Sequence, residues 1–144
     1  MRLLTVSLCV VLLLPAFGCS FNRAWKQAAA HSLPDEGITG RWEGTWASEV
    51  NHHHGRLRAL LTKDGAGVYQ ARFHATFLRV LSASYTVPLR VTQMDGEFEL
   101  AGEQDLGWLS GGAYTYNGKA SSTNFFCIYR SSSDHGTFQM NRPQ

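Results

Sequence analysis

The sequence predicts an all-β fold over residues 38–144, a small antiparallel up-and-down barrel of about eight strands. Three observations support this prediction. From Thr39 onward, apolar and polar residues alternate with a period of two, as in strands with one buried and one wet face. Turn-forming residues separate these runs at short intervals. No run after Thr39 has the 3.6-residue period of an amphipathic helix, and 144 residues leave room for one domain.

The alternation is clearest in the run that starts at Tyr69, where Phe73 and Phe77 share one face and Arg72 and His74 the other. Similar runs predict the other strands. In order, the expected strands cover residues 41–46, 57–62, 69–77, 85–92, 97–101, 113–117, 123–131 and 137–141. Because consecutive strands share one apolar face, they can close into a barrel that has no exposed edge. A two-sheet β-sandwich is the alternative.

Residues that favour tight turns stand between the strands. The predicted turns contain Lys63-Asp64-Gly65, Met94-Asp95-Gly96, Ser110-Gly111-Gly112, Asn117-Gly118 and Asp134-His135-Gly136. Pro88 falls inside a predicted strand, where its missing N–H removes one ladder hydrogen bond. It therefore marks an edge, a bulge or a corner of the sheet.

The first 18 residues have the anatomy of a secretory signal peptide. Arg2 supplies a positive charge, a largely apolar run covers residues 3–14, and Pro15 ends it. This run is too short for a comfortable membrane span. The residues that follow, Ala16-Phe17-Gly18-Cys19, resemble a bacterial lipobox, with Ala16 where Leu is usual.

The lipobox resemblance implies cleavage after Gly18, diacylglycerol on the Cys19 thiol, and an amine acylated by a group such as palmitate. More than one acyl chain gives stable membrane anchoring. In a Gram-negative cell, Ser20 instead of an acidic residue after Cys19 favours the outer membrane. We therefore expect a lipoprotein of the cell envelope, and simple secretion is the alternative.

Residues 19–37 are expected to form a lipidated tether between the anchor and the barrel. Asn22 is a good N-cap and the alanines at 28–30 favour helix, so residues 22–31 predict two to three helical turns. The sequence Leu-Pro-Asp-Glu-Gly at 33–37 then ends the helix.

Charge and cysteine content exclude two common classes of protein. Arg2 is the only charged residue of the predicted signal peptide, so its removal leaves 12 basic and 11 acidic residues. Such a balance lacks the basic face that nucleic-acid binding needs. Cys9 leaves with the signal peptide and Cys19 carries lipid, so the remaining Cys127 can form no internal disulfide. Cys127 lies in an apolar run and is expected to be a buried thiol.

The two ends of the β region resemble those of the calycins, the lipocalin-like barrels. Gly40-Arg41-Trp42 opens the region like their G-x-W, and Arg142 follows the last strand. The resemblance implies that Trp42 plugs the closed end of a barrel and that Arg142 stacks on it. The chain departs from lipocalins because it lacks their disulfide, their C-terminal helix and their long entrance loops.

A second resemblance, to small bacterial lipoproteins of uncharacterised function, covers most of the β region. It rests on Gly40-x-Trp42-x-Gly44-x-Trp46, on His54-Gly55, and on Asp134-x-Gly136-x-Phe138-x-Met140-x-Arg142. It implies no activity.

No pattern in the sequence predicts catalysis or a cofactor. The acidic residues Glu97, Glu99, Glu103 and Asp105 crowd one hairpin instead of flanking a cleft. The serines at 131–133, with Asp134 and His135, form a tight turn without an evident oxyanion hole. His52, His53 and His54 are candidates for weak metal binding only, because neighbouring residues on an extended chain point to opposite sides. His74 is expected on the protein surface.

The predicted inner face is the candidate for ligand binding. Its large aromatic residues are Trp46, Tyr69, Phe73, Phe77, Tyr85, Tyr114, Tyr116 and Phe138. An eight-stranded barrel is either filled by such side chains or holds one small ligand. The small residues Ala59, Ala71 and Ala75 leave some room.

The sequence therefore predicts a non-catalytic binding barrel for a small apolar ligand or an envelope component. The alternative is a protein-binding module, such as an inhibitor of an exogenous hydrolase. A carrier requires an apolar cavity of a few hundred Å3, whereas an inhibitor requires a packed interior and a rigid projecting loop.

Overall fold

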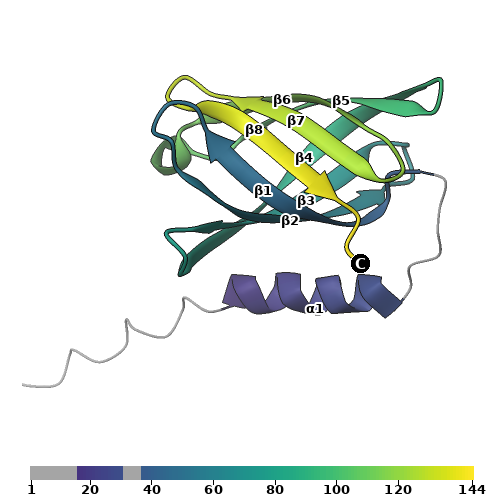
Figure 1. Ribbon diagram of the computed structural model, residues 1–144, viewed down its shortest axis with the longest axis horizontal. Coiled ribbons are helices and arrows are strands. Elements are labelled where there is room, and N and C mark those ends of the chain that lie inside the picture. Colours follow the sequence, from purple (N-terminus) through teal and green to yellow (C-terminus); the bar gives the residue numbers. More distant parts are fainter. Residues whose placement is uncertain (1–15, 31–36) are drawn as a thin grey trace, which may run out of the picture.

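The computed structural model describes residues 16–30 and 37–144, so most of the predicted signal peptide lies outside the described residues. The β region is a closed barrel in which the eight strands follow one another in sequence order (Figure 1). The strands are β1 (Gly40–Ser48), β2 (His54–Lys63), β3 (Tyr69–Phe77), β4 (Leu81–Met94), β5 (Glu97–Asp105), β6 (Ala113–Ala120), β7 (Asn124–Arg130) and β8 (His135–Asn141).

The barrel has the up-and-down topology that the alternation predicts. Each strand pairs antiparallel with the next, and β8 closes the barrel by pairing with β1, where Phe138 lies opposite Trp46. Because this closure leaves one continuous sheet, the sandwich alternative is wrong. Closure also removes the exposed edges that an open sheet of this length would leave.

Pro88 lies where the pairing between β4 and β5 ends. The ladder between β4 and β5 begins at the pair Leu89–Gly102 and runs on to Met94–Glu97. Pro88 pairs with Gln70 on the other side, so residues 81–88 are paired with β3 and not with β5. The first half of β4 therefore has no ladder partner on β5.

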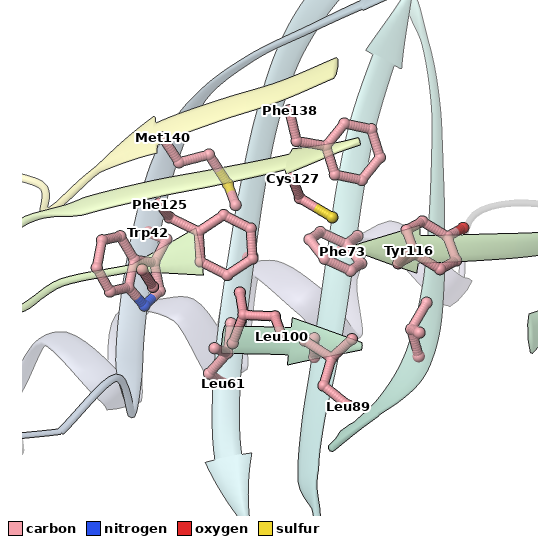
Figure 2. Packing of buried hydrophobic residues seen from close by; sticks show 14 of the residues in the cluster. Trp42, Leu61, Phe73, Leu89, Leu100, Tyr116, Phe125, Cys127, Phe138 and Met140 are labelled. Carbon is pink, nitrogen blue, oxygen red and sulfur yellow. The ribbon is translucent and has the colours of Figure 1, made fainter. Parts of the chain in front are cut away.

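The closed end of the barrel is filled around Trp42, which is fully buried. Its ring lies beside Phe125, with 5.7 Å between the centroids, and Met140 packs above them (Figure 2). The Trp42 indole Nε1 donates a hydrogen bond to the carbonyl of Ile38 (2.9 Å). The buried apolar side chains of the other strands continue this core toward the middle of the barrel.

One predicted turn is wrong. Asn117-Gly118 lies inside β6, where Gly118 pairs with Cys127 of β7. A Cβ at Gly118 would collide with the Phe126 carbonyl oxygen and come within 2.7 Å of the Cys127 Cα. The glycine serves close approach of two strands, and the turn lies instead at residues 121–123.

The helix α1 (Ala16–Ala30) begins earlier than the tether prediction and lies against the outside of the barrel (Figure 1). Its Phe21 is fully buried and stacks on His74 with 4.7 Å between ring centroids. His74 is therefore buried, contrary to the expectation of a surface residue, because α1 covers this part of the outer face of β3. Among the described residues, no helix has the length and apolarity needed to cross a membrane.

Candidate ligand cavity at the open end of the barrel

The end of the barrel opposite Trp42 is ringed by four loops. They connect β1 to β2, β3 to β4, β5 to β6 and β7 to β8, and they comprise residues 49–53, 78–80, 106–112 and 131–134. We call this end the mouth. The loop between β5 and β6 contains a short 3-10 helix, η1 (Trp108–Ser110).

A cavity of about 560 Å3 lies inside the mouth. Its walls are mostly aromatic and aliphatic, with a few hydroxyl groups and one carboxylate. The lining residues are Trp46, Ala75, Phe77, Ala83, Ser84, Tyr85, Leu106, Leu109, Ser110, Tyr114, Tyr116, Tyr129, Asp134 and Phe138.

The cavity contains most, but not all, of the aromatic residues predicted to line it. Those that line it are Trp46, Phe77, Tyr85, Tyr114, Tyr116 and Phe138. Phe73 instead fills the barrel below the cavity, packed against Tyr85 and Phe138 at 5.5 and 5.2 Å between ring centroids. Tyr69 starts β3 near the closed end, where the Lys63 ammonium lies 5.6 Å from its ring. The barrel is thus filled in one half and hollow in the other.

Sequence reasoning missed the residues that the loops contribute. Leu106, Leu109 and Ser110 belong to a loop with no period of two, so alternation could not assign them to a face. Tyr129 lies on the same buried face of β7 as Phe125 and Cys127, so the period of two could have identified it. The small side chain of Ala75 had indicated room inside the barrel, and Ala75 does line the cavity.

Trp46 is fixed in the cavity wall by a contact across two strands. Its indole Nε1 donates to the carbonyl of Thr76 on β3 (3.1 Å), and the ring reaches there over β2. This reach requires Gly55, the direct partner of Trp46 on β2, because a Cβ there would lie 2.6 Å from the Trp46 Nε1. The His54-Gly55 sequence thus has a local physical reason.

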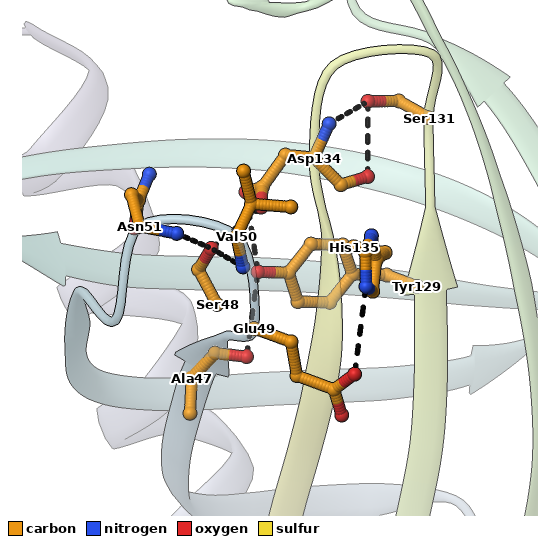
Figure 3. Close-up of polar contacts among 9 residues, drawn as sticks. All are labelled: Ala47, Ser48, Glu49, Val50, Asn51, Tyr129, Ser131, Asp134 and His135. Atoms are coloured by element: carbon orange, nitrogen blue, oxygen red, sulfur yellow. Dashed lines mark hydrogen bonds and ion pairs between the residues drawn. The ribbon is translucent and has the colours of Figure 1, made fainter.

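A polar network holds one side of the mouth together (Figure 3). The Ser48 hydroxyl donates to the Asp134 carboxylate at 2.6 Å, and the Tyr129 hydroxyl donates to the same carboxylate at 3.3 Å. Burial raises the pKa of Tyr129, and the neighbouring Asp134 carboxylate raises it further. The phenol therefore stays protonated and acts as a donor inside the wall.

Tyr85 and Tyr116 place a second pair of hydroxyls in the cavity. Burial raises the pKa of both phenols, so both stay protonated. Neutral phenols can donate or accept one hydrogen bond from a ligand. Among the described residues that line the cavity, none carries a positive charge, and Asp134 is the one with a carboxylate. The site therefore favours an uncharged apolar molecule over an anion.

The remaining candidate residues lie apart from the cavity. His52 and His53 are exposed in the loop between β1 and β2, and His54 is exposed at the start of β2. Within the described part of the chain, no group of residues is placed to hold a metal ion. The Ser131 hydroxyl accepts from the Asp134 backbone N–H, whereas His135 faces Glu49 at 3.5 Å. These contacts close a turn and form no Ser–His pair.

Cys127 is buried within the filled half of the barrel. Burial raises the pKa of its thiol to about 12. A thiol in that state is a poor nucleophile at neutral pH, as its apolar sequence context predicts.

The closed barrel and the contact at its closed end are consistent with a calycin-like barrel. The chain forms a closed antiparallel barrel, and the Arg142 guanidinium lies over the plugging residue Trp42. Comparison of the chain with protein-family models, with curated proteins and with solved structures gave no match.

Proposed function

We propose that the protein is a lipid-anchored component of the cell envelope that binds one small, uncharged, apolar molecule in the cavity at its mouth. The cavity itself is the observation that carries this proposal. Its volume of about 560 Å3 lies within the range of ligand sites, about 300–1,000 Å3. Its mostly apolar wall with a few hydroxyls also matches the usual composition of such sites.

The cavity favours a ligand carrier over an inhibitor. A protein that acts only through projecting loops needs no hollow interior. The other half of this barrel is filled by side chains, so the cavity is not a necessary result of the fold. The loop with Trp108 and Leu109 is the feature that an inhibitor would present. Because Leu109 also lines the cavity, the same loop forms part of the proposed ligand site.

Binding is tested by native mass spectrometry of the protein from its own membranes, followed by titration with an uncharged fluorescent naphthylamine. We expect a co-purifying apolar molecule that the probe displaces. Ala75→Phe should fill the cavity and abolish probe binding without unfolding the barrel. Ala47→Phe, on the exposed outer face of β1 near the mouth, is the matched control. If both variants bound the probe equally well, the cavity would not be the binding site and the proposal would be contradicted.

Anchoring rests on the signal-peptide anatomy of residues 1–18 and on Cys19. We expect Cys19→Ala to lose the mass of the lipid and to be either released from membranes or left unprocessed. Unchanged mass and unchanged membrane association would contradict the anchor and leave the cavity proposal untouched.

A further inference from the structure

We infer that the mouth of the barrel rests on the lipid bilayer, with its apolar loops inserted, so that the cavity opens toward the membrane. This inference extends the proposed function, since it uses the proposed anchor to bring the bilayer close. The occupant of the apolar surface is the membrane itself.

The mouth gathers most of the exposed large apolar side chains in the described part of the chain. Those at the mouth are Val50, Leu78, Val80, Leu81, Trp108 and Leu109, and the others are Met94, Phe126 and Ile128. The exposed fractions reach 86% for Trp108, 84% for Val80 and 80% for Leu109. A cluster of this kind marks a binding surface for an apolar partner. We call these six side chains the apolar rim.

The apolar rim adjoins the stretch of β4 that is not paired with β5. Most of its members lie in the loop between β3 and β4 and the loop between β5 and β6. These loops flank the part of β4 that precedes Pro88, where β4 and β5 are not paired. Leu109 belongs to the rim and also lines the cavity, so apolar surface continues from the rim into the cavity. A molecule could therefore pass between bilayer and cavity without crossing water.

The tip of the loop between β3 and β4 has an unusual backbone. Leu78 and Arg79 have φ values of 46° and 68°, in the left-handed region that glycine and asparagine favour. Strain of this kind gathers at functional sites. Arg79 stands between Leu78 and Val80, and an arginine there suits the phosphate level of a bilayer while its apolar neighbours enter it.

The chain leads from the membrane to this same end of the barrel. Helix α1 lies with its first residues toward the mouth and its last toward the closed end (Figure 1). Phe21 stacks on His74, whose ring bonds to the Ser84 hydroxyl at 2.7 Å. Ser84 is on the order of 10 Å along β4 from Leu81 of the rim. Cys19 precedes Phe21 by about 3 Å of helix.

This direction distinguishes the bilayer from other occupants of the rim. A lipid on Cys19 joins the barrel on the mouth side, because the first residues of α1 lie toward the mouth (Figure 1). The mouth therefore faces the membrane, whereas a partner protein or a second copy would have to displace the bilayer from it.

The test uses the full-length lipidated protein, reconstituted in phosphatidylcholine vesicles with bromine atoms on the acyl chains. Subtracting the spectrum of Trp108→Phe isolates the emission of Trp108. We expect this emission to shift to the blue and to lose most of its intensity relative to unbrominated vesicles. Vesicle flotation measures anchoring in the same samples.

A pair of variants gives the matched control. Leu78→Ser with Leu109→Ser should restore most of the Trp108 emission, whereas Phe126→Ser with Ile128→Ser, on the outer face of β7, should not. Equal effects of the two pairs would overturn the inference. Protein that floats with unquenched Trp108 would also overturn it, and would point to a second copy or a partner on the rim while the anchor stands. Cys19→Ser protein that still floats with quenched Trp108 would support the docking and remove the anchor.

Discussion

The Arg142 guanidinium lies 4.0 Å from the centroid of the Trp42 indole and at the same time donates hydrogen bonds to two other segments of the backbone. Its Nη1 donates to the Thr39 carbonyl at 2.6 Å, its Nη2 donates to Gly37 at 3.0 Å, and its Nε donates to Ser122 at 3.1 Å. One side chain thus covers the plug and joins the chain before β1 to the turn after β6. The planar fork of arginine is suited to this task, whereas a lysine ammonium is not.

Trp42→Ala should bring the barrel close to unfolding. Truncating a buried Trp costs about 3–5 kcal/mol, out of about 5–15 kcal/mol for a typical domain. Arg142→Ala should cost about 1–3 kcal/mol, from the cation–π contact and the carbonyls left without their donor. Urea titration of both single variants and the double variant measures these free energies of unfolding.

The two losses should be non-additive, because touching residues couple. Arg90→Ala, at an exposed position on β4, is the control and should change stability by less than about 0.5 kcal/mol. Additive losses for Trp42 and Arg142 would mean that the two side chains contribute independently.

The period of two favoured the barrel over the sandwich, because most strands have one buried and one wet face. The exceptions are the first part of β4 and the stretches of β2 and β3 around Leu60 and His74, where the outer face is also buried. The period of two could not predict α1 on the outside, since the residues that α1 covers, such as His74, follow the polar side of the alternation. The turn at Asn117-Gly118 was wrong for a related reason. A glycine that permits close strand contact and a glycine that permits a turn look alike in sequence.

The candidate site was predictable where strands form it. Inward alternation identified Trp46, Tyr85 and Tyr116, but it could not say where the filled core ends, because Phe73 has the same pattern. The boundary depends on how far each ring reaches in three dimensions. The loop around Trp108 was beyond prediction, since its side chains follow no period.

Gly55→Ala should destabilise the barrel by about 1–3 kcal/mol, the range for overpacking. The added Cβ meets the Thr76 carbonyl oxygen and the Trp46 indole, so Trp46 must leave its place in the cavity wall. Probe binding should weaken as well. The control is Gly65→Ala, where an added Cβ meets nothing within 4 Å, and which should be neutral or slightly stabilising. If the two variants have the same free energy of unfolding in urea titration, the close approach at Gly55 does not contribute to stability.

His74 should make the fold less stable in mild acid. Burial lowers its pKa below the ordinary 6.5, and the Arg58 and Arg72 guanidinium groups lower it further. Above pH 6.5 the ring is neutral in both folded and unfolded chains and contributes nothing to pH dependence. As pH falls through this value, the unfolded chain gains a proton more readily, so the free energy of unfolding decreases.

Urea titrations at pH 7 and pH 5 measure this effect of His74. His74→Gln should reduce the loss of stability between pH 7 and pH 5. An NMR titration that finds the His74 pKa at or above 6.5 would contradict the prediction.

Replacing His52, His53 and His54 by Ala should change the free energy of unfolding by less than about 0.5 kcal/mol, because all three are exposed. Only weak zinc or copper binding should disappear. Calorimetric titration of the protein and the variant with zinc and with copper measures the affinity for each metal ion. A submicromolar affinity that these substitutions abolish would make this loop a genuine metal site.

Leu78→Gly and Val80→Gly should have opposite effects on stability, although both residues are exposed and stand in the same loop. Leu78 has a φ of 46°, and Val80 is outside the left-handed region. A non-glycine residue costs about 1–2 kcal/mol in the left-handed conformation, and glycine elsewhere costs about 0.5–1 kcal/mol through chain entropy. Leu78→Gly should therefore unfold at higher urea than Val80→Gly, with a difference in the free energy of unfolding of about 1.5–3 kcal/mol. Both variants lose an apolar side chain of the rim, so both should reduce quenching of Trp108 by brominated lipid. A Leu78→Gly protein that is more stable yet less deeply inserted would show that this turn keeps its leucine for contact with the membrane, at the expense of the fold.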